Sequence, residues 1–398
     1  MNNHFNFELT QFPKEMKLLL SLLKTERKEE ILFWNEDWFQ NFDWKLFLDL
    51  AVHHRVFPIL YQKVKSLENE HIPSFVIQFL QKEYQKNVFR MLQLTGEMEV
   101  VAKLFGFHQI RTIFLKGPNL AADLYDNLSL RTSADLDVLI PIENLQKAEE
   151  LLLNQGYTKD EYIQTVLNDW KWRHHHFTFF HPVKQIKVEL HWRFNPGPAW
   201  EPKFNELWNR RRRSSFSKYP IYILGLEDLF LFLVTHGARH GWSRLRWLMD
   251  IRELIKKNID WNKTIQLLKK NHYLQIGGQA LILVSQLLNA EVPNEMKKLI
   301  IEIQTRRLAY DALFYIKQMV NLHHYPLPEK VAQYHKRHLI TLMSKTQKTF
   351  FALSLLFPYP EDVKVIPLPK YLHFLYIPLR PIILILKKTR KRAVTRRV

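Results

Sequence analysis

The chain has 398 residues, of which 46% are hydrophobic and 24% charged, a composition that is ordinary for a globular protein and far from that of a disordered one. The length exceeds one typical domain, so two or three compact units are expected, and the absence of cysteine excludes disulfides, thiolate zinc sites and a cysteine nucleophile. The formal charge of +19 makes the surface attractive to polyanions: nucleotides, nucleic acid, phospholipid headgroups or anionic glycopolymers.

Residues 1–108 are predicted to form an N-terminal helical region without strands. From about Pro13 onward apolar residues recur at spacings of three and four, as in Phe75, Val76 and Phe79.

The first residues lack the basic start and apolar stretch of a signal peptide, and a chain without cysteine fits a reducing compartment. We therefore expect a cytoplasmic protein.

Residues 109–224 show the pattern of an α+β core. A short apolar run over residues 110–115 ends at Gly117 and Pro118, which predicts a buried strand that enters a turn. A helix is expected over residues 118–125. The order strand, turn, helix is the first sign of a mixed sheet with helices packed on it.

The next strand is predicted over residues 131–140, where polar and apolar side chains alternate. Its apolar face contains Ala134, Leu136, Val138 and Ile140. The polar face contains Arg131, Ser133, Asp135 and Asp137.

Three further elements complete the predicted core. A helix is expected to begin at Pro141 and to end before Gly156. Strands over residues 177–180 and 186–192 then flank a hairpin-like turn. On the second of these strands, a period of two places Lys187, Glu189, His191 and Arg193 on one polar face.

The acidic residues of this core predict a metal site. Two aspartates at positions i and i+2 of a strand point the same way, with alpha carbons about 6.5–7 Å apart, so Asp135 and Asp137 can converge on one cation. Glu189, on a later strand, supplies a third carboxylate. Clustered carboxylates repel one another unless divalent cations offset their charge, and oxygen ligands suit Mg²⁺ or Mn²⁺. Asp135, Asp137 and Glu189 are therefore the candidate catalytic and metal-binding residues of a two-metal site.

A nucleoside triphosphate is the substrate that fits this metal site. Lys116 and Gly117 end a strand and lead into a helix N-terminus, where free amides and the helix dipole can bind phosphates. Arg131 and Ser133 share the polar face of the aspartates, and His191 shares that of Glu189. These five residues, Lys116, Gly117, Arg131, Ser133 and His191, are the candidate nucleotide-binding residues.

Three segments carry a resemblance to a known family: FLKGPNLAADLYDNLSLRTSADLDVLIP, KVELHWRF and THGARHGWSRLRWLMDI. Together they resemble a poorly characterised nucleotidyltransferase family of the DNA polymerase beta superfamily, over roughly residues 110–254. The resemblance implies that a Gly-containing turn at Gly117 binds the triphosphate, that Asp135 and Asp137 bind both metals, and that Glu189 binds the catalytic one. Two departures are that proline follows Gly117, where the superfamily usually has serine or glycine, and that the third acid is glutamate.

The resemblance implies a metal-dependent nucleotidyltransferase, with a polymerase beta-like mixed sheet core flanked by helical regions. It would move a nucleoside monophosphate from an NTP to a hydroxyl or phosphate acceptor and release pyrophosphate. The acceptor is unknown and could be a small molecule, peptide, glycan or protein. Two alternatives remain: a noncatalytic relative that binds nucleotide, and an RNA-directed terminal transferase or nucleic-acid binder. The second is motivated by the net charge and is not favoured, because no RNA-binding module is recognisable.

Histidines recur near the predicted site without a clear metal pattern. His174, His175 and His176 are consecutive, and on a strand such residues point to opposite faces, so they are not expected to ligate one ion together with His181 and His191. Use in a loop or substrate cleft is expected instead. His236 and His240 have the spacing of a zinc protease helix but lack the general-base glutamate, so a helical packing motif that lines the cleft is expected; its other members are Trp242, Arg244, Trp247 and Asp250.

The remainder of the chain is predicted to be helical. Residues 225–356 are expected to form a C-terminal helical domain and residues 357–398 an apolar and basic tail. The stretch 371–386 is largely apolar, but His373, Arg380 and two prolines make it too short and broken to span a bilayer. Packing of this stretch on the domain is favoured, with peripheral docking on an anionic membrane as the alternative.

Overall fold

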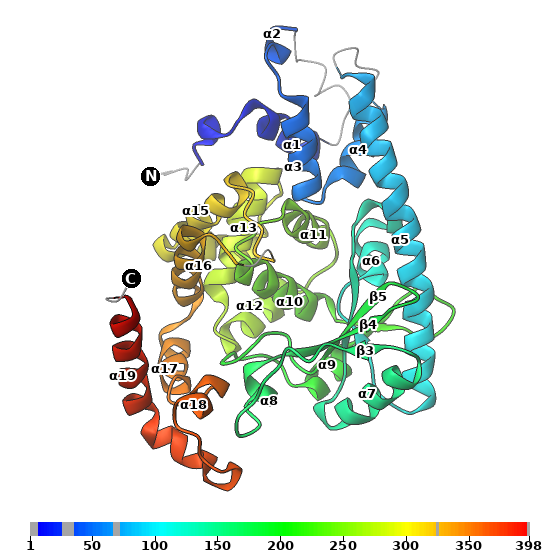
Figure 1. The fold of residues 1–398 in the computed structure, drawn as a ribbon. Helices are drawn as coiled ribbons and strands as arrows, with labels where there is room; N and C mark the ends of the chain where they lie inside the picture. Colours follow the sequence, from blue (N-terminus) through cyan, green and yellow to red (C-terminus); the bar gives the residue numbers. More distant parts are fainter. Residues whose placement is uncertain (1–6, 26–35, 67–71, 324–325, 396–398) are drawn as a thin grey trace.

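A seven-stranded mixed sheet lies beside a large group of helices in the computed structural model, which describes residues 7–25, 36–66, 72–323 and 326–395 (Figure 1). The strand order is β3-β4-β5-β2-β1-β7-β6. The pairs β2–β5 and β1–β7 are parallel, and the other neighbours are antiparallel. The strands are β1 (Ile113–Phe114), β2 (Asp135–Leu139), β3 (Thr158–Lys159), β4 (His176–His181), β5 (Ile186–His191), β6 (Arg212–Arg213) and β7 (Tyr222–Ile223).

The core elements confirm most of the predicted pattern. The helix expected over residues 118–125 is α6 (Pro118–Tyr125), and the helix before Gly156 is α7 (Leu145–Asn154). The two strands of the predicted hairpin are β4 and β5. The alternating segment 131–140 forms a strand only from Asp135, because a 3₁₀ helix capped by the Asn127 side chain precedes it. Strands β3, β6 and β7 were not predicted, since two residues are too few to show a period.

The N-terminal helices form one group that ends in a helix of 34 residues, α5. Among the described residues before Ile113 there is no strand, as predicted, while residues 1–6, 26–35 and 67–71 of this region lie outside the described chain. The Asp43 carboxylate accepts a hydrogen bond from the Leu46 amide at 2.9 Å and so caps α3. The helices are α1 (Lys14–Lys24), α2 (Glu36–Phe39), α3 (Trp44–His53), α4 (Phe57–Ser66) and α5 (Ser74–Phe107).

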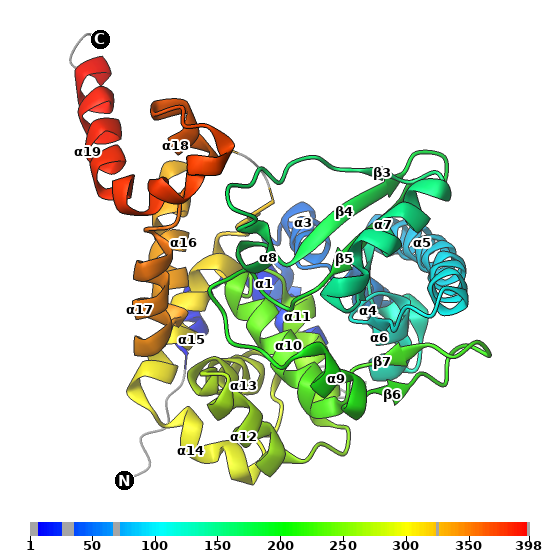
Figure 2. The ribbon, with the colours of Figure 1, turned by 90° about the horizontal axis from the view of Figure 1, so that it is seen from below.

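Helix α5 belongs to both of the large hydrophobic cores. Its first turns place Val76 and Leu80 in the core formed with the helical regions, whereas Met98 and Phe105, further along, pack into the core under the sheet. Figures 1 and 2 both show α5 along one edge of the molecule, beside α6, α7 and the sheet. The helix therefore connects the two cores physically.

The C-terminal helices cover the side of the sheet opposite α5, and α19 lies farthest from α5 in both views (Figure 2). Every helix among the described residues is too short or too polar to cross a membrane. The helices after α7 are α8 (Trp170–Arg173), α9 (Phe204–Arg210), α10 (Leu226–Arg239), α11 (Leu245–Ile255), α12 (Trp261–Lys270), α13 (Leu274–Leu288), α14 (Lys297–Ile300), α15 (Ile303–Lys317), α16 (Glu329–Leu342), α17 (Lys345–Ser354), α18 (Pro360–Val365) and α19 (Tyr376–Thr395). The 3₁₀ helices are η1 (Leu9–Gln11), η3 (Leu128–Leu130), η4 (Ile142–Asn144), η5 (Asn294–Met296) and η6 (Lys370–Leu375).

A buried ion pair fixes α11 to the segment that enters β2. Arg131 donates from Nε to Asp250 Oδ1 at 2.9 Å and from Nη2 to Asp250 Oδ2 at 3.0 Å, and both side chains are buried. The Tyr125 hydroxyl, at the end of α6, donates to Asp250 Oδ1 at 2.9 Å. Because the pair is bidentate and enclosed, it holds the helical region in one position relative to the sheet.

Replacing Asp250 by alanine is expected to lower the free energy of unfolding by about 3–5 kcal/mol, because the Arg131 guanidinium would be left buried without its counter-ion. Urea denaturation of the variant and the wild type measures the loss. The matched control is Asp126→Asn, which removes the exposed partner of Lys257 and should change stability by at most about 1 kcal/mol. Equal effects of the two substitutions would contradict the assigned role of Asp250.

Candidate functional site

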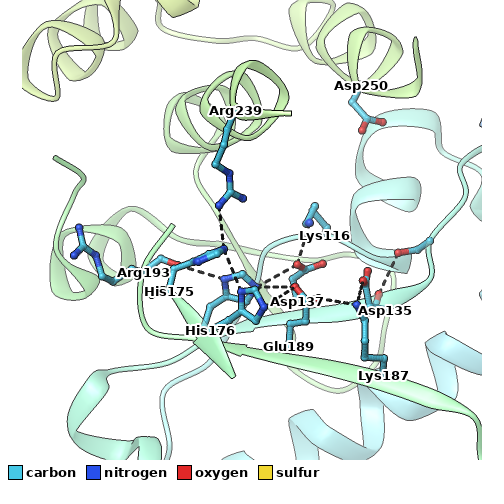
Figure 3. A network of polar contacts seen from close by, with 12 residues as sticks. Lys116, Asp135, Asp137, His175, His176, Lys187, Glu189, Arg193, Arg239 and Asp250 are labelled. Atoms are coloured by element: carbon cyan, nitrogen blue, oxygen red, sulfur yellow. Dashed lines mark hydrogen bonds and ion pairs between the residues drawn. The ribbon is translucent and has the colours of Figure 1, made fainter. Parts of the chain in front are cut away.

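The parallel pairing of β2 with β5 brings three acidic side chains together. In this register Asp137 lies directly opposite Glu189, and Asp135 lies opposite Lys187. Ligand atoms of Asp137, Glu189 and His191 all lie within 4.8 Å of one another. Figure 3 shows the side chains of Asp135, Asp137 and Glu189 on the same side of the two strands, so the sheet gathers the three predicted carboxylates.

Neighbouring cations neutralise these carboxylates. Lys116 Nζ lies 2.9 Å from Asp137 Oδ1, and Lys187 Nζ lies 3.0 Å from Asp135 Oδ2 and 2.7 Å from Glu189 Oε1 (Figure 3). His191 Nε2 lies 3.2 Å from Asp137 Oδ1 and 3.5 Å from Glu189 Oε2. Each carboxylate therefore has a positive or proton-donating neighbour.

The same contacts govern the pKa values of the site. Burial alone would raise the pKa of Asp137, but the charge of Lys116 and the hydrogen bond of His191 hold it below its usual value. Burial opposes ionisation of Glu189 too, and His191, His176 and Lys187 together lower its pKa well below the ordinary range. The carboxylates are thus ionised at neutral pH and are available as oxygen ligands.

The donor set suits a divalent cation. Asp137 is fully buried, and its Oδ2 atom has no hydrogen-bond partner among the described residues. A buried carboxylate oxygen without a partner is costly unless a cation meets it. Oxygen atoms from Asp135, Asp137 and Glu189 are the ligands that Mg²⁺ and Mn²⁺ prefer.

The carboxylates open into a cavity of about 880 Å³ between the sheet and the helices α10 and α11. Most of its charged lining is basic. Seven basic residues line the cavity, against the four acidic residues Asp135, Asp137, Asp160 and Glu189; the basic residues are Arg55, Lys116, Arg131, Lys187, Arg239, Arg244 and Arg246. Such a lining favours a polyanionic ligand.

The five predicted nucleotide-binding residues lie around this site with different contacts. Lys116 and His191 touch Asp137, and the Ser133 hydroxyl donates to the main-chain oxygen of Asp135 at 3.1 Å. Gly117 has a φ of 99°, which disfavours any side chain, and begins α6 beside the backbone of Asp135. Arg131 also lines the cavity, but its guanidinium is already bound by Asp250. Four of the five predicted residues therefore line the cavity, and Gly117 does not. Of the four, Arg131 is bound by Asp250.

Two histidines were misplaced by the strand argument. Because β4 begins at His176, His175 precedes the strand and the two rings do not point to opposite faces. His176 Nδ1 and His175 Nε2 lie 3.1 Å apart, and both rings lie beside that of His191. His181 stands at the other end of β4, against Tyr157, so only part of the histidine set converges.

Sequence reasoning placed Arg244 at the cleft but missed three other arginines of the cavity: Arg55, Arg239 and Arg246. Arg55 follows α3 with a φ of 55°, a conformation that glycine or asparagine usually takes at a helix end. Arg239 ends α10, and Arg244 and Arg246 begin α11. The pattern S-R-L-R after the α10–α11 turn was a usable signal for Arg246, whereas Arg55 and Arg239 reach the site only through the tertiary fold.

The histidines of the expected packing motif line the same cavity. The rings of His236, His240 and Trp247 contact one another, with centroids 4.7–5.5 Å apart, and Trp247 is buried as expected. Burial and the nearby charge of Lys116 lower the pKa of His236 well below its usual value, and burial with Arg239 does the same for His240. The two rings are neutral, so they can accept or donate hydrogen bonds without repelling the basic residues.

Acidic residues gathered on paired strands of a mixed sheet, under a basic cavity, are typical of enzymes that transfer phosphoryl or nucleotidyl groups. The model of a family described as an uncharacterised nucleotidyltransferase matches residues 40–289 of the chain. The chain belongs to this family. No curated protein matches the chain. A general role in nucleotidyl transfer is supported by the family.

A histidine behind the site predicts a pH effect on stability. His338, on α16, is buried, and its Nε2 lies 2.8 Å from the main-chain oxygen of Ala238 in the last turn of α10. Burial lowers its pKa from 6.5 to about 4, so the folded state keeps the ring neutral. The stability that this neutral ring contributes is fully present above pH 6.5 and is lost as the pH falls toward 4.

His338→Gln is expected to lose less stability than the wild type when the pH is lowered from neutrality to about 4, by up to about 3 kcal/mol. Glutamine retains a donor for Ala238 but does not titrate. Urea denaturation at a series of pH values measures the difference, and parallel pH profiles for the two proteins would contradict the assignment.

Proposed function

We propose that the protein is a metal-dependent nucleotidyltransferase with a core of the DNA polymerase beta type. The supporting observation is the pairing of Asp137 with Glu189 across β2 and β5, with Asp135 on the same face, at the base of a basic cavity. The reaction moves a nucleoside monophosphate from an NTP to an acceptor oxygen. A bond forms between that oxygen and the α-phosphorus as the bond to pyrophosphate breaks, and a hydroxyl acceptor releases its proton.

Asp135, Asp137 and Glu189 would hold Mg²⁺ or Mn²⁺. When bound, the ions supply the positive charge that phosphoryl transfer needs at the attacking and leaving oxygens. The protein's own part is to orient these three carboxylates and to keep Asp137 and Glu189 ionised. His191 lies two residues after Glu189 on β5, and its ring contacts both Asp137 and Glu189. These contacts orient the two carboxylates.

The basic lining is the second support for the proposal. Lys116 and Arg246 extend from opposite sides, the sheet and α11, into the lining of one cavity. Arg246 donates from Nη1 to the hydroxyl and main-chain oxygens of Thr132, while its buried Nε has no partner among the described residues. A triphosphate would give Arg246 the anionic partner that the described residues do not provide, and would add a second anion beside Lys116. The enclosing helices would also keep bulk water from the reacting phosphate.

A noncatalytic relative that binds nucleotide is the second candidate, and Lys187 is the observation that favours it. Its ammonium group lies between Asp135 and Glu189, where it balances both charges. If that contact were permanent, lysine would replace a cation of the metal pair. The Lys187 side chain is 37% exposed and long, however, so it can turn outward and give up both carboxylates to a metal ion.

Asp137→Asn is expected to lower Mg²⁺-dependent transfer of label from NTP by at least about a thousandfold, since one metal ligand is lost while the shape of the side chain is kept. The assay incubates the pure protein with α-labelled NTPs and cell extract and follows the label into product. The matched control is Asp160→Asn, an exposed acidic residue at the rim of the same cavity, which should retain activity within a few fold.

Lys187→Met separates the two candidates. In the catalytic case the variant binds Mn²⁺ at least as tightly as the wild type, because a competing cation is gone, and calorimetric titration with MnCl₂ measures this. In the noncatalytic case the wild type fails to bind Mn²⁺ and only the variant, which has lost the competing ammonium group, binds it, and no labelled product depends on Asp137. Mn²⁺ binding that survives in Asp137→Asn would also contradict the proposed metal site.

A further inference from the structure

Arg239 is a cation that has no anionic partner in the described part of the chain. It lies at the end of α10, and none of the described carboxylates is within ion-pair distance of it. Its Nη1 donates to His175 Nε2 at 3.2 Å, and its Nε is buried without a partner among the described residues (Figure 3). Burying a charged guanidinium is costly when its only hydrogen-bond partner is a neutral imidazole. An anion bound to the guanidinium would offset that cost.

A second cavity, of about 250 Å³, lies on the other side of Arg239. Arg239 belongs to the lining of both this cavity and the larger one that contains the carboxylates. The walls of the second cavity are mostly apolar and come from α13, α16, α17 and the loop after β5. They include Ile276, Leu339, Leu342, Met343, Phe351 and Ala199. We call this second cavity the Arg239 pocket.

We propose that the Arg239 pocket binds the acceptor, and that the acceptor is an amphipathic anion, with a carboxylate or phosphate group on Arg239 and an apolar body against Ile276, Leu342 and Phe351. The name acceptor rests on the proposed nucleotidyltransferase function, whereas the binding of such an anion does not. Arg239 lines both the pocket and the larger cavity that contains Glu189. A molecule anchored there can therefore present an oxygen to the carboxylate site.

The nucleotide itself fits this pocket poorly. A triphosphate is too polar for the apolar walls. A nucleobase is neutral, so it would leave the charge of Arg239 unbalanced. The basic residues of the larger cavity, such as Lys116 and Arg246, already provide for phosphates. An anionic head joined to an apolar body matches both properties of the pocket at once.

Titration calorimetry with sodium octanoate, octyl phosphate and octanol, in the absence of NTP and metal, tests the proposal. The wild type is expected to bind one or both anions at least about tenfold more tightly than octanol, because a charged pair with arginine adds to the same apolar contact. Arg239→Met, which keeps the length of the side chain, should abolish that difference. Arg239→Lys should retain part of it.

Two further variants make the outcome decisive. Ala199→Phe fills the pocket from the loop after β5 and should weaken binding of all three probes, with thermal unfolding as the check of its fold. Asp137→Asn should lose nucleotidyl transfer but keep anion binding, so failure of the proposed function and failure of the pocket are distinguishable. Absence of anion binding to the wild type, or equal anion affinity of Arg239→Met, would overturn the proposal. Displacement of the probes by adenosine would also overturn it and identify a nucleobase pocket.

A second inference concerns α19 and rests on separate observations. One face of this helix packs on α18 and its neighbours through Tyr376 and Ile383, which are buried. Around the helix, Ile377 and Leu384 lie about a quarter to a third of a turn from these buried residues and Ile385 lies about half a turn away. All three are exposed, by 63% for Ile385. The aromatic residues Tyr371 and Phe374, just before α19, are exposed as well.

We infer that this exposed face rests on an anionic membrane surface. The sequence of the same helix continues with Lys388, Arg390, Lys391 and Arg392, so an apolar face and a basic run are combined, as in helices that lie on membrane surfaces. The two figures show α19 at the periphery, where a planar surface can reach it. The charge of the run favours phospholipid headgroups over a neutral partner.

Co-sedimentation with vesicles of phosphatidylcholine and phosphatidylserine at four to one tests this second inference. The wild type is expected to sediment with these vesicles and not with pure phosphatidylcholine. Ile377→Ser combined with Ile385→Ser should weaken the association at least about tenfold, since two apolar side chains are lost from the surface contact. Val183→Ser, which removes an even more exposed apolar side chain at the β4–β5 turn, is the control and should bind like the wild type. Binding that is independent of phosphatidylserine, or unchanged in the double variant, would refute the inference.

Discussion

The register between β2 and β5 is the constraint on which the site depends. Side chains alternate along a strand, so a slip of one residue would turn Asp135 and Asp137, or Glu189, toward the core that Leu136 and Val188 now fill. The apolar residues between the acids therefore fix the acids in place. Crowded carboxylates on one face are tolerated because Lys116, Lys187 and His191 meet them, and these cations come from the same small sheet or its edge.

The helical regions contribute the opposite wall of the cavity. The turn between α10 and α11 is closely packed: a Cβ on Gly237 would lie 2.3 Å from the Trp242 ring, and Gly241 has a φ of 60°. This turn sets the direction of α11, and with it the positions of Arg244 and Arg246. Together with the buried contact between Arg131 and Asp250, it makes the basic residues part of a rigid frame around the carboxylates. The excess positive charge of the chain is thus concentrated partly inside the molecule.

The sequence allowed prediction of the features that have a local signal. The alternation around Asp135 and Asp137 and that around Glu189 indicated strands with a polar face, and the glycine and proline at positions 117 and 118 marked the start of a helix. The α+β class with a mixed sheet followed from these elements. The pairing of β2 with β5 across about fifty residues had no local signal, and neither did the approach of Arg55 or Arg239 to the cavity. The position of His175 was predicted wrongly because side chains alternate between faces only inside a strand, and His175 lies just before β4.

Helix α5 has a consequence for how the protein can be divided. Val76 and Leu80 complete the core of the helical regions, while Met91, Leu94 and Met98 cover the underside of the sheet. A fragment that begins after this helix would uncover the apolar underside of the strands that carry the acids, and would associate with other chains through it. The acidic site and the long helix must therefore be expressed and purified together, although the helix contributes no residue to the lining of the larger cavity among the residues described.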